Sequence, residues 1–332
     1  MSIVKWSEIE AFHNVRKYCH SYPHHMCGAD KVQYRAKVKL HGTNAAVQIH
    51  PDSHVVAQSR TAELTPGKGD NAGFAAWVAS QEARWEACPS DLVIFGEWCG
   101  PGIQKGVAIN QIPGKAFVVF AARSLEAGSD VLIVQPTALE KIVPGLPGVY
   151  VLPWAEPTLE IPWLTPPSDL EGITRVINEH VEAVEKCDPW VEATFQVKGT
   201  GEGLVFYPVS NEHLGVQNFS NLAFKAKGEA HRVVKAKTSA QVEPEVAASV
   251  DQFVAMVLTE ARLDQGATTV NATNPNVNPV EFDKRLTGKF MAWIEEDIKK
   301  ETRAELEASG LTYEQVQKAL VARARRWYLG KS

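Results

Sequence analysis

The spacing of apolar residues changes once along this 332-residue chain, near residue 238, and that change constrains the fold most. Before it, short apolar or alternating runs are separated by Gly, Pro, Asn and Asp, the pattern of strands joined by turns. We expect strands over 34–39, 45–49, 92–95, 117–121, 131–134, 195–197, 203–207 and 222–225. Helices are expected over 7–15, 71–87 and 170–185, and a loop with an edge strand is expected over 144–167. The first part is therefore predicted to be a mixed α+β body.

Beyond residue 238 the apolar residues follow the helical period. Ser249 and Gln252 have the spacing of a capping box, which typically opens a helix. Helices are expected over 249–261, 282–298 and 312–327, with a loop over 266–279. We therefore expect two domains, an α+β domain over 1–238 and a small all-helical domain over 247–332.

Composition restricts the classes of protein to which the chain can belong. No run of about 18 apolar residues occurs, so no membrane span is predicted. The amino end lacks the pattern of a secretion or import signal, and five unpaired-looking cysteines suit a reducing cytoplasm. The net charge of -5 limits any contact with a polyanion to local clusters, such as Lys225, Lys227, Arg232, Lys235 and Lys237.

A lysine at the end of a predicted strand is the first candidate for chemistry. Lys39 is followed by Leu40, His41, the turn residue Gly42 and, two residues later, Asn44. A tight glycine turn after the strand directs the Lys39 amine into the cleft that the turn borders. A lysine must lose its proton to attack phosphorus, so this role requires nearby cations or a metal ion. Alone, the motif is typical of an ordinary surface lysine before a hairpin.

Four further signals follow in order along the chain. Glu97 comes directly after an apolar strand and a glycine, and Phe120 ends another apolar strand. Glu202 lies between two glycines at a strand start. Lys225 and Lys227 alternate along a strand, so both amines project from one face. Each signal has an ordinary structural explanation, but these explanations do not account for the whole ordered set.

The ordered set K-x-H-G-x-N, F-G-E, an apolar strand ending in an aromatic, E-G-L-V and K-x-K resembles the covalent nucleotidyltransferase superfamily. That superfamily contains ATP-dependent DNA ligases, RNA ligases and mRNA capping enzymes. His41, where DNA ligases and capping enzymes carry aspartate, and Asn44 are similar to the RNA ligase 2 family of phage and RNA-editing ligases. The resemblance covers Trp6 to Arg232 and implies an antiparallel-sheet, ATP-grasp-like nucleotidyltransferase domain. The helical tail resembles the family's carboxyl-terminal domain only in size and class.

The resemblance implies roles at the nucleophile end of the site. Lys39 would take AMP from ATP, with Leu40 beside the nucleotide. His41 and Asn44 would shape the turn and assist the phosphate step. Arg60, which follows Gln58 and Ser59, matches the family's downstream arginine and would contact a nucleotide or RNA phosphate.

It also implies roles for the later signals. Glu97 would accept the ribose hydroxyl, Phe120 would stack on adenine, and Glu202 would hold a divalent metal. Lys225 and Lys227 would neutralise the α-phosphate and help Lys39 to lose its proton. The chain departs from the family after Phe120, where Ala121, Ala122 and Arg123 stand in place of an expected aspartate.

The implied reaction has three steps: AMP transfer from ATP to Lys39, AMP transfer to an RNA 5′-phosphate, and attack by an RNA 3′-hydroxyl. Its cofactors would be ATP, used as covalent AMP, and Mg²⁺ or Mn²⁺. We expect a cytoplasmic monomer that acts in RNA repair. A nicked duplex is the favoured RNA substrate, and a broken tRNA loop and free single strands stay open as alternatives. A ligase for DNA or mixed ends, and a non-catalytic nucleic-acid-binding relative, are the alternatives.

Three other signals are given structural interpretations. The segment Cys19–Cys27, with His24 and His25, lacks zinc-finger spacing and is expected to be a His-rich loop. The glycine-rich stretch 100–106, which contains Lys105, lacks P-loop spacing and is expected to be a flexible loop near Glu97. The third signal, Arg323, Arg325 and Arg326 beside Trp327 and Tyr328, is expected to complement the dipole of a helix end rather than to bind RNA.

Overall fold

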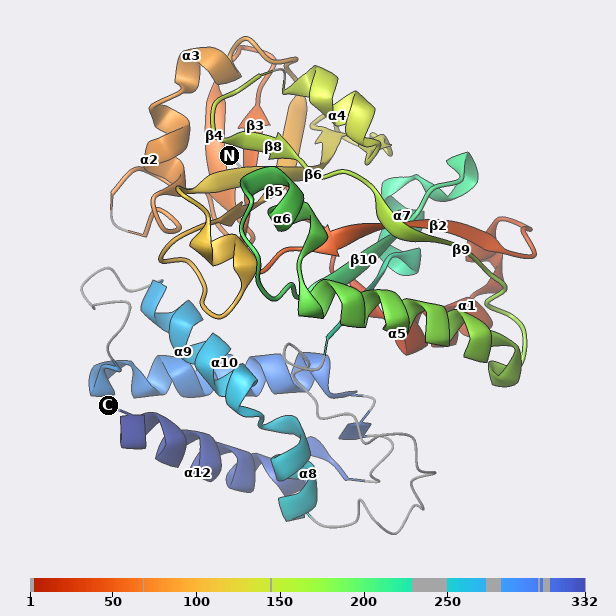
Figure 1. The fold of residues 1–332 in the computed structure, drawn as a ribbon, viewed down its shortest axis with the longest axis vertical. Coiled ribbons are helices and arrows are strands. Elements are labelled where there is room, and N and C mark those ends of the chain that lie inside the picture. The colour runs from red at the N-terminus through yellow and green to blue at the C-terminus, as the bar shows by residue number, and fades with distance from the viewer. Residues whose placement is uncertain are drawn as a thin grey trace. The chain divides into compact units, whose positions relative to one another are not determined.

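A computed structural model shows how the chain folds (Figure 1). It describes residues 3–67, 69–143, 145–228, 250–272, 282–303, 305–306 and 311–331. The chain divides into two compact units, Met1–Gly228 and Glu229–Ser332. None of the helices in the described ranges has the length and apolar character needed to cross a membrane.

The first unit contains a five-stranded and a six-stranded sheet. In spatial order, the first sheet consists of β1 (Glu10–Ala11), β11 (Phe224–Lys227), β10 (Gly203–Pro208), β2 (Val32–Lys39) and β9 (Ala155–Ile161). The second consists of β4 (Val55–Ser59), β3 (Thr43–Ile49), β5 (Leu92–Cys99), β6 (Ala116–Ser124) and β7 (Leu132–Ile133), with β8 (Val149–Val151) paired to β6. Pairing is antiparallel except at β1–β11 and β6–β8. The turn from β2 to β3 joins the sheets, so Lys39 lies where the chain crosses between them.

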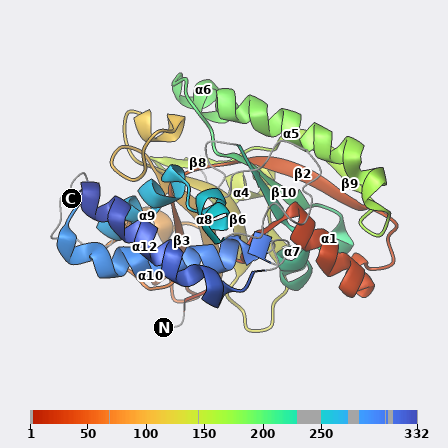
Figure 2. The same cartoon turned by 90° about the horizontal axis from the view of Figure 1, so that it is seen from below.

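Helices cover both sheets. The five-stranded sheet packs against α1 (Phe12–Ser21) and α5 (Glu171–Lys186), and α5 runs alongside β9 and β10 (Figure 2). The other helices of this unit are α2 (Phe74–Ala79), α3 (Glu82–Trp85), α4 (Pro136–Ile142), α6 (Pro189–Phe195) and α7 (Val216–Leu222). Short 3₁₀ turns occur at Pro23–Met26, Ala108–Gln111, Pro167–Leu170 and Asn211–His213.

Aromatic packing holds the outer face of the five-stranded sheet. The rings of Phe206 and Phe224 stack with centroids 4.6 Å apart, and Tyr34 packs against Phe224 at 5.2 Å. The Tyr34 hydroxyl donates to the Leu222 carbonyl and accepts from the Trp163 indole, each at 2.9 Å. This packing gives β2, β10 and β11 one buried face, because side chains alternate along a strand.

The opposite face of these strands carries the lysines. The strand register places Lys39 and Lys227 on either side of Gly203. In the next row of same-face residues, it places Lys37 and Lys225 on either side of Val205. Gly203 has φ +144°, and a Cβ there would collide with the Ala226 carbonyl. A glycine is therefore required at the point where β10 passes between the two lysines.

The second unit is helical within its described residues. Its helices are α8 (Val250–Val257), α9 (Glu260–Ala272), α10 (Thr287–Glu301) and α12 (Tyr313–Lys331), with a 3₁₀ turn at Lys284–Leu286. Phe290 stacks on Tyr328 at 4.4 Å in its core, and buried Arg262 pairs with Asp297 at 2.8 Å. The expected α+β class, with antiparallel sheets followed by a helical region, is confirmed. The expected boundary at 238–247, like Ser249 of the capping box, lies outside the described residues.

Two helices predicted in the first unit form, but with different bounds. The segment 7–15 was expected to be helical, but α1 begins only at Phe12. Trp6 packs against three aromatic rings, and Glu10–Ala11 pairs with β11, so tertiary packing overrides the helical period. The helix predicted over 71–87 starts at Phe74 because three consecutive left-handed residues precede it, and it is interrupted between α2 and α3.

Other predicted boundaries also need correction. The strand over 195–197 does not form, because buried Asp188 caps α6 and that helix extends to Phe195. The strand over 222–225 is displaced to Phe224–Lys227, and α7, which precedes it, was not predicted. The strand over 131–134 is reduced to β7, whereas β9 confirms the edge strand expected within 144–167.

The helical unit corrects two further predictions. The helix over 249–261 ends at Val257, because the Thr259 hydroxyl accepts from the Arg262 amide and begins α9. The loop predicted over 266–279 is helical to Ala272, and residues 273–279 lie outside the described ranges.

We expect Phe224→Ala to lower the free energy of unfolding by about 3–5 kcal/mol, because it removes a fully buried ring from the aromatic packing beneath β11. Urea unfolding measures this loss. Val131→Ala, at a side chain 56% exposed, is the control and should change stability by less than about 0.5 kcal/mol. Equal, small effects of both substitutions would contradict this account of the sheet.

Candidate functional site

Lys39 and Glu202 form an ion pair at the junction of the two sheets. The Lys39 Nζ lies 2.7 Å from Glu202 Oε2. Lys39 ends β2, and Glu202 directly precedes β10, so the antiparallel register brings residues 163 positions apart into contact. Glu202 is buried, whereas the Lys39 side chain remains 24% exposed. A ligand that arrives from solution can therefore contact Lys39, whereas its partner Glu202 is shielded from solvent.

Glu202 has two further partners. Its second oxygen, Oε1, lies 3.3 Å from Lys227 Nζ, and the His41 Nδ1 lies 3.5 Å from Oε2. We call Lys39, His41, Glu202 and Lys227 the Glu202 cluster. Burial alone would raise the pKa of Glu202, but the adjacent Lys39 and Lys227 outweigh burial and hold that pKa well below 4.5. The carboxylate is therefore charged at neutral pH.

Glu97 lies on the opposite sheet and faces the turn after Lys39. Its Oε1 accepts from the Gly42 amide at 3.0 Å, and Asn44 lies directly opposite it in the β3–β5 pairing. Burial raises the pKa of Glu97 from 4.5 to about 7, although Lys39 opposes this shift. Glu97 can therefore change its protonation state near neutral pH.

The remaining predicted residues lie around this centre. Phe120 is half-buried and packs against Trp6, with ring centroids 5.0 Å apart. Arg60 is 45% exposed and pairs with Glu8 at 3.6 Å rather than with the Glu202 cluster. Leu40 is buried in the core, so only its backbone is available to a ligand.

Lys225 occupies the row of the sheet next to Lys227. It is half-buried and projects from the same face, since the two residues alternate along β11. The structure thus brings Lys39, His41, Glu202 and Lys227 into direct contact and places Lys225 beside them.

Sequence reasoning missed two residues near this centre. Gln104, from the predicted glycine-rich loop, donates to the Gly42 carbonyl at 3.2 Å, whereas Lys105 is exposed. Lys37, two residues before Lys39, is fully buried on the same face of β2. The alternation of β2 already indicated the face of Lys37, but no feature of the sequence indicated its burial.

The His- and Cys-containing segment forms the end of α1 and a 3₁₀ turn. Cys19 is buried, which raises its pKa to about 12, whereas Cys27 is exposed and its sulfur accepts from Asn218. Within the described ranges, no group of three or more His, Cys, Asp or Glu side chains is arranged to hold a metal ion.

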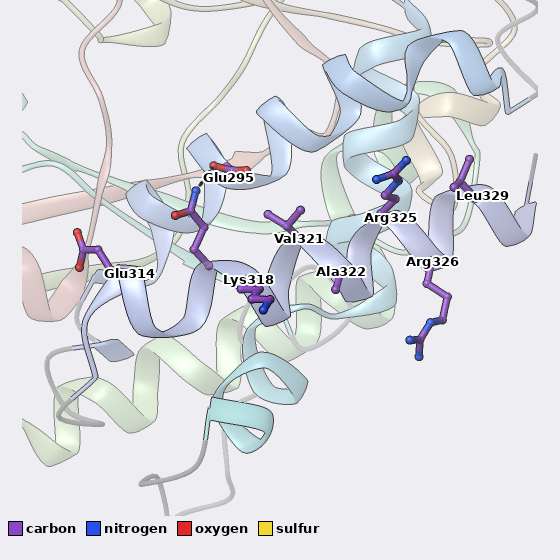
Figure 3. Close-up of a pocket in the computed structure, with 9 residues that line it drawn as sticks. Glu295, Glu314, Lys318, Val321, Ala322, Arg325, Arg326 and Leu329 are labelled. Atoms are coloured by element: carbon purple, nitrogen blue, oxygen red, sulfur yellow. Dashed lines mark hydrogen bonds between the residues drawn. The ribbon is translucent and has the colours of Figure 1, made fainter.

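The helical unit has an open groove of about 720 Å³ along α12 (Figure 3). Lys318, Arg325 and Arg326 lie along it, all exposed. The predicted dipole role of the arginines is wrong, because α12 continues to Lys331 and the dipole acts only within the last turn.

The aromatic residues next to these arginines are part of the core. Trp327 packs against Phe282 and Phe290, and Tyr328 is fully buried. Tyr328 therefore presents no surface on which a nucleic-acid base could stack, whereas Trp327 is partly exposed and the Lys331 Nζ lies 5.0 Å from its ring centroid.

The Glu202 cluster can support transfer of a phosphoryl-type group. Lys39 offers an amine, and Lys227 offers a fixed positive charge within reach of the same carboxylate. A single buried carboxylate fits Mg²⁺, which keeps several waters and binds few protein ligands. It does not fit an ion that requires a full cage of protein ligands.

Comparisons with known proteins find similarity to RNA ligases. The family model for RNA ligase matches residues 32–227. Solved structures of Naegleria gruberi RNA ligase variants also match: one with AMP and Mn has 18% identity and a TM-score of 0.44. Another, with ATP and Mn, has 18% identity and a TM-score of 0.42. Each match covers 69% of this chain and 57% of the Naegleria chain. None of the curated proteins matches the chain.

We expect Glu97→Gln to flatten the dependence of stability on pH. The pKa of Glu97 is raised on folding, so its contribution is present below about pH 4.5 and is lost as the pH rises through about 7. Wild-type protein should lose roughly 3 kcal/mol more than the variant across this range. Urea unfolding at several pH values measures the difference, and parallel curves would show that burial does not perturb Glu97.

Proposed function

The chain belongs to the RNA ligase family, and we propose that it is an ATP-dependent ligase that joins RNA 3′-hydroxyl and 5′-phosphate ends through Lys39. One observation carries the proposal: an accessible lysine amine shares a buried carboxylate with a second lysine at the junction of two sheets. The chain spans 57% of the length of the Naegleria structures that it matches. The activity of the whole protein is therefore proposed from its own residues.

In the first step, Lys39 Nζ attacks the α-phosphorus of ATP. An N–P bond forms, the bond to pyrophosphate breaks, and the amine releases a proton. Lys39 must first separate from Glu202 and lose a proton to solvent, because an ammonium nitrogen has no free electron pair and the adjacent carboxylate stabilises the charged form. The triphosphate supplies a competing anion for Lys39 and Lys227, so nucleotide binding favours this exchange.

The neighbouring residues align and neutralise the phosphate. Lys227 and Lys225 stabilise the charge on the α-phosphate, where pre-positioned cations act most strongly. His41 and Asn44 hold the turn, and Glu202 would hold Mg²⁺, which supplies further neutralisation of phosphate charge.

The outer residues of the site bind the nucleoside and the RNA. Glu97 accepts the ribose hydroxyl when its carboxyl group is ionised, and the half-buried Phe120 stacks on adenine. Arg60, which is exposed, would leave Glu8 to contact a phosphate of the RNA or the nucleotide.

Two transfers complete the reaction. An RNA 5′-phosphate oxygen attacks the adenylate phosphorus, and the N–P bond to Lys39 breaks. An RNA 3′-hydroxyl then attacks the activated 5′-phosphate, and AMP leaves. We further propose that the substrate is a nicked RNA duplex, that the enzyme works as a cytoplasmic monomer, and that its role is RNA repair.

We expect wild-type protein incubated with Mg²⁺ and ATP labelled at the α-phosphate to retain label covalently. Lys39→Ala should retain none, because it removes the nucleophile. Lys31→Ala, a half-exposed lysine paired with Glu160 at 3.6 Å, is the control and should label like wild type. Label retained by the Lys39 variant would refute the assignment of the nucleophile.

Sealing assays on nicked RNA, nicked DNA and single-stranded RNA separate the alternatives. RNA-specific sealing supports the proposal, and faster sealing of nicked DNA supports a DNA ligase. Nucleic-acid binding without any label indicates a non-catalytic relative.

We expect Lys227→Ala to slow formation of lysyl-AMP by about 100-fold, because it removes a fixed cation from the phosphate site. Single-turnover adenylylation at saturating ATP measures this rate. The assay temperature should lie below the thermal unfolding transition of the variant, because removing Lys227 takes a partner from the buried Glu202 carboxylate and lowers stability. An unchanged rate would remove Lys227 from the proposed mechanism.

A further inference from the structure

Lys37 is a fully buried lysine inside the same unit. It lies on β2, and its Nζ donates to the Phe120 and Val134 carbonyls, each at 2.8 Å. The rings of Trp154 and Tyr207 flank the amine, with centroids 4.8 and 5.2 Å from Nζ. Among the described residues, no carboxylate forms an ion pair with Lys37, and burial lowers its pKa to about 7.

Such a lysine is costly to bury. A charged amine loses hydration, and two carbonyls and two aromatic faces offset only part of that loss. An apolar side chain of similar length would fill the same volume without this cost. Packing alone therefore does not explain why an amine, rather than an apolar side chain, occupies position 37.

The position of Lys37 relates it to the nucleotide site proposed above. Lys37 and Lys39 project from one face of β2, and two residues of strand separate their Cα atoms by roughly 7 Å. Lys37 reaches from the five-stranded sheet to β6 of the six-stranded sheet, where its acceptor is the backbone of Phe120. One buried amine thus connects the strand of the nucleophile to the residue assigned to adenine stacking.

We propose that Lys37 is a positioning residue for the nucleoside: by fixing the Phe120 backbone against β2, it sets where the stacking ring lies relative to Lys39. The inference rests on the proposed function. Lys37 itself is buried and does not touch the nucleotide, so it acts through Phe120.

This role makes a prediction that a purely structural role does not. The base end of the site should weaken while its phosphate end stays intact. Adenosine and inorganic tripolyphosphate probe these ends separately, as competitors of ATP in the lysyl-AMP assay. Lys37→Met should weaken inhibition by adenosine about tenfold, the order expected for impaired stacking of one base, and leave inhibition by tripolyphosphate unchanged.

Two variants complete the experiment. Lys227→Ala should give the reverse pattern, with tripolyphosphate weakened and adenosine unchanged. Phe120→Ala should reproduce the adenosine loss, and it keeps the test valid if Lys37→Met does not fold. Lys31→Met is the matched control for removal of a lysine charge and should change neither competitor.

The outcomes are distinct from those that test the ligase activity. Wild-type protein that forms no lysyl-AMP would refute the proposed function itself. With wild-type activity present, the inference about Lys37 is overturned if adenosine does not compete in wild type. It is equally overturned if Phe120→Ala leaves adenosine inhibition intact, or if Lys37→Met weakens both competitors equally.

Discussion

The sharing of one buried carboxylate by two lysines is the interaction on which the site depends. Glu202 reaches Lys39 with one oxygen and Lys227 with the other. The pairing of β2, β10 and β11 fixes this arrangement, because Gly203 lies between the two lysines in register. A shift of one residue in either pairing would turn a lysine to the opposite face of the sheet. The chemistry therefore rests on strand register more than on any local motif.

One face of these three strands stabilises the fold, and the opposite face carries the charged groups of the site. One face carries the aromatic packing of Tyr34, Phe206 and Phe224, which stabilises the sheet against α1 and α5. The other face carries charged groups whose burial opposes stability. Lys37 shows this cost as a pKa lowered to about 7, and burial also raises the pKa of Glu97, on the six-stranded sheet, to about 7. The aromatic face offsets that cost, so the charged face can stay organised before a ligand binds.

The sequence was most informative where alternation and turn residues agreed. The strand that ends at Lys39 and the strand that follows Glu202 were predicted close to their observed bounds, because each is a short apolar run next to a glycine or a turn. The strand predicted over 92–95 instead continues through Gly96 and Glu97 to Cys99. The helix predicted over 7–15 begins only at Phe12, because the packing of Trp6 and the pairing of Glu10–Ala11 with β11 determine the structure before it. The contact between Glu202 and Lys39, which are 163 positions apart, and the burial of Lys37 depend on pairing between strands distant in sequence. Local patterns do not encode that pairing.

The central claim is that Lys39, and not the neighbouring buried amine of Lys37, becomes covalently bonded to AMP. Fragmentation mass spectrometry of the protein after reaction with ATP, kept at alkaline pH to preserve an N–P bond, tests it directly. The account predicts one AMP group per chain, located on Lys39. An AMP group located on Lys37, or on any residue outside the Glu202 cluster, would contradict it.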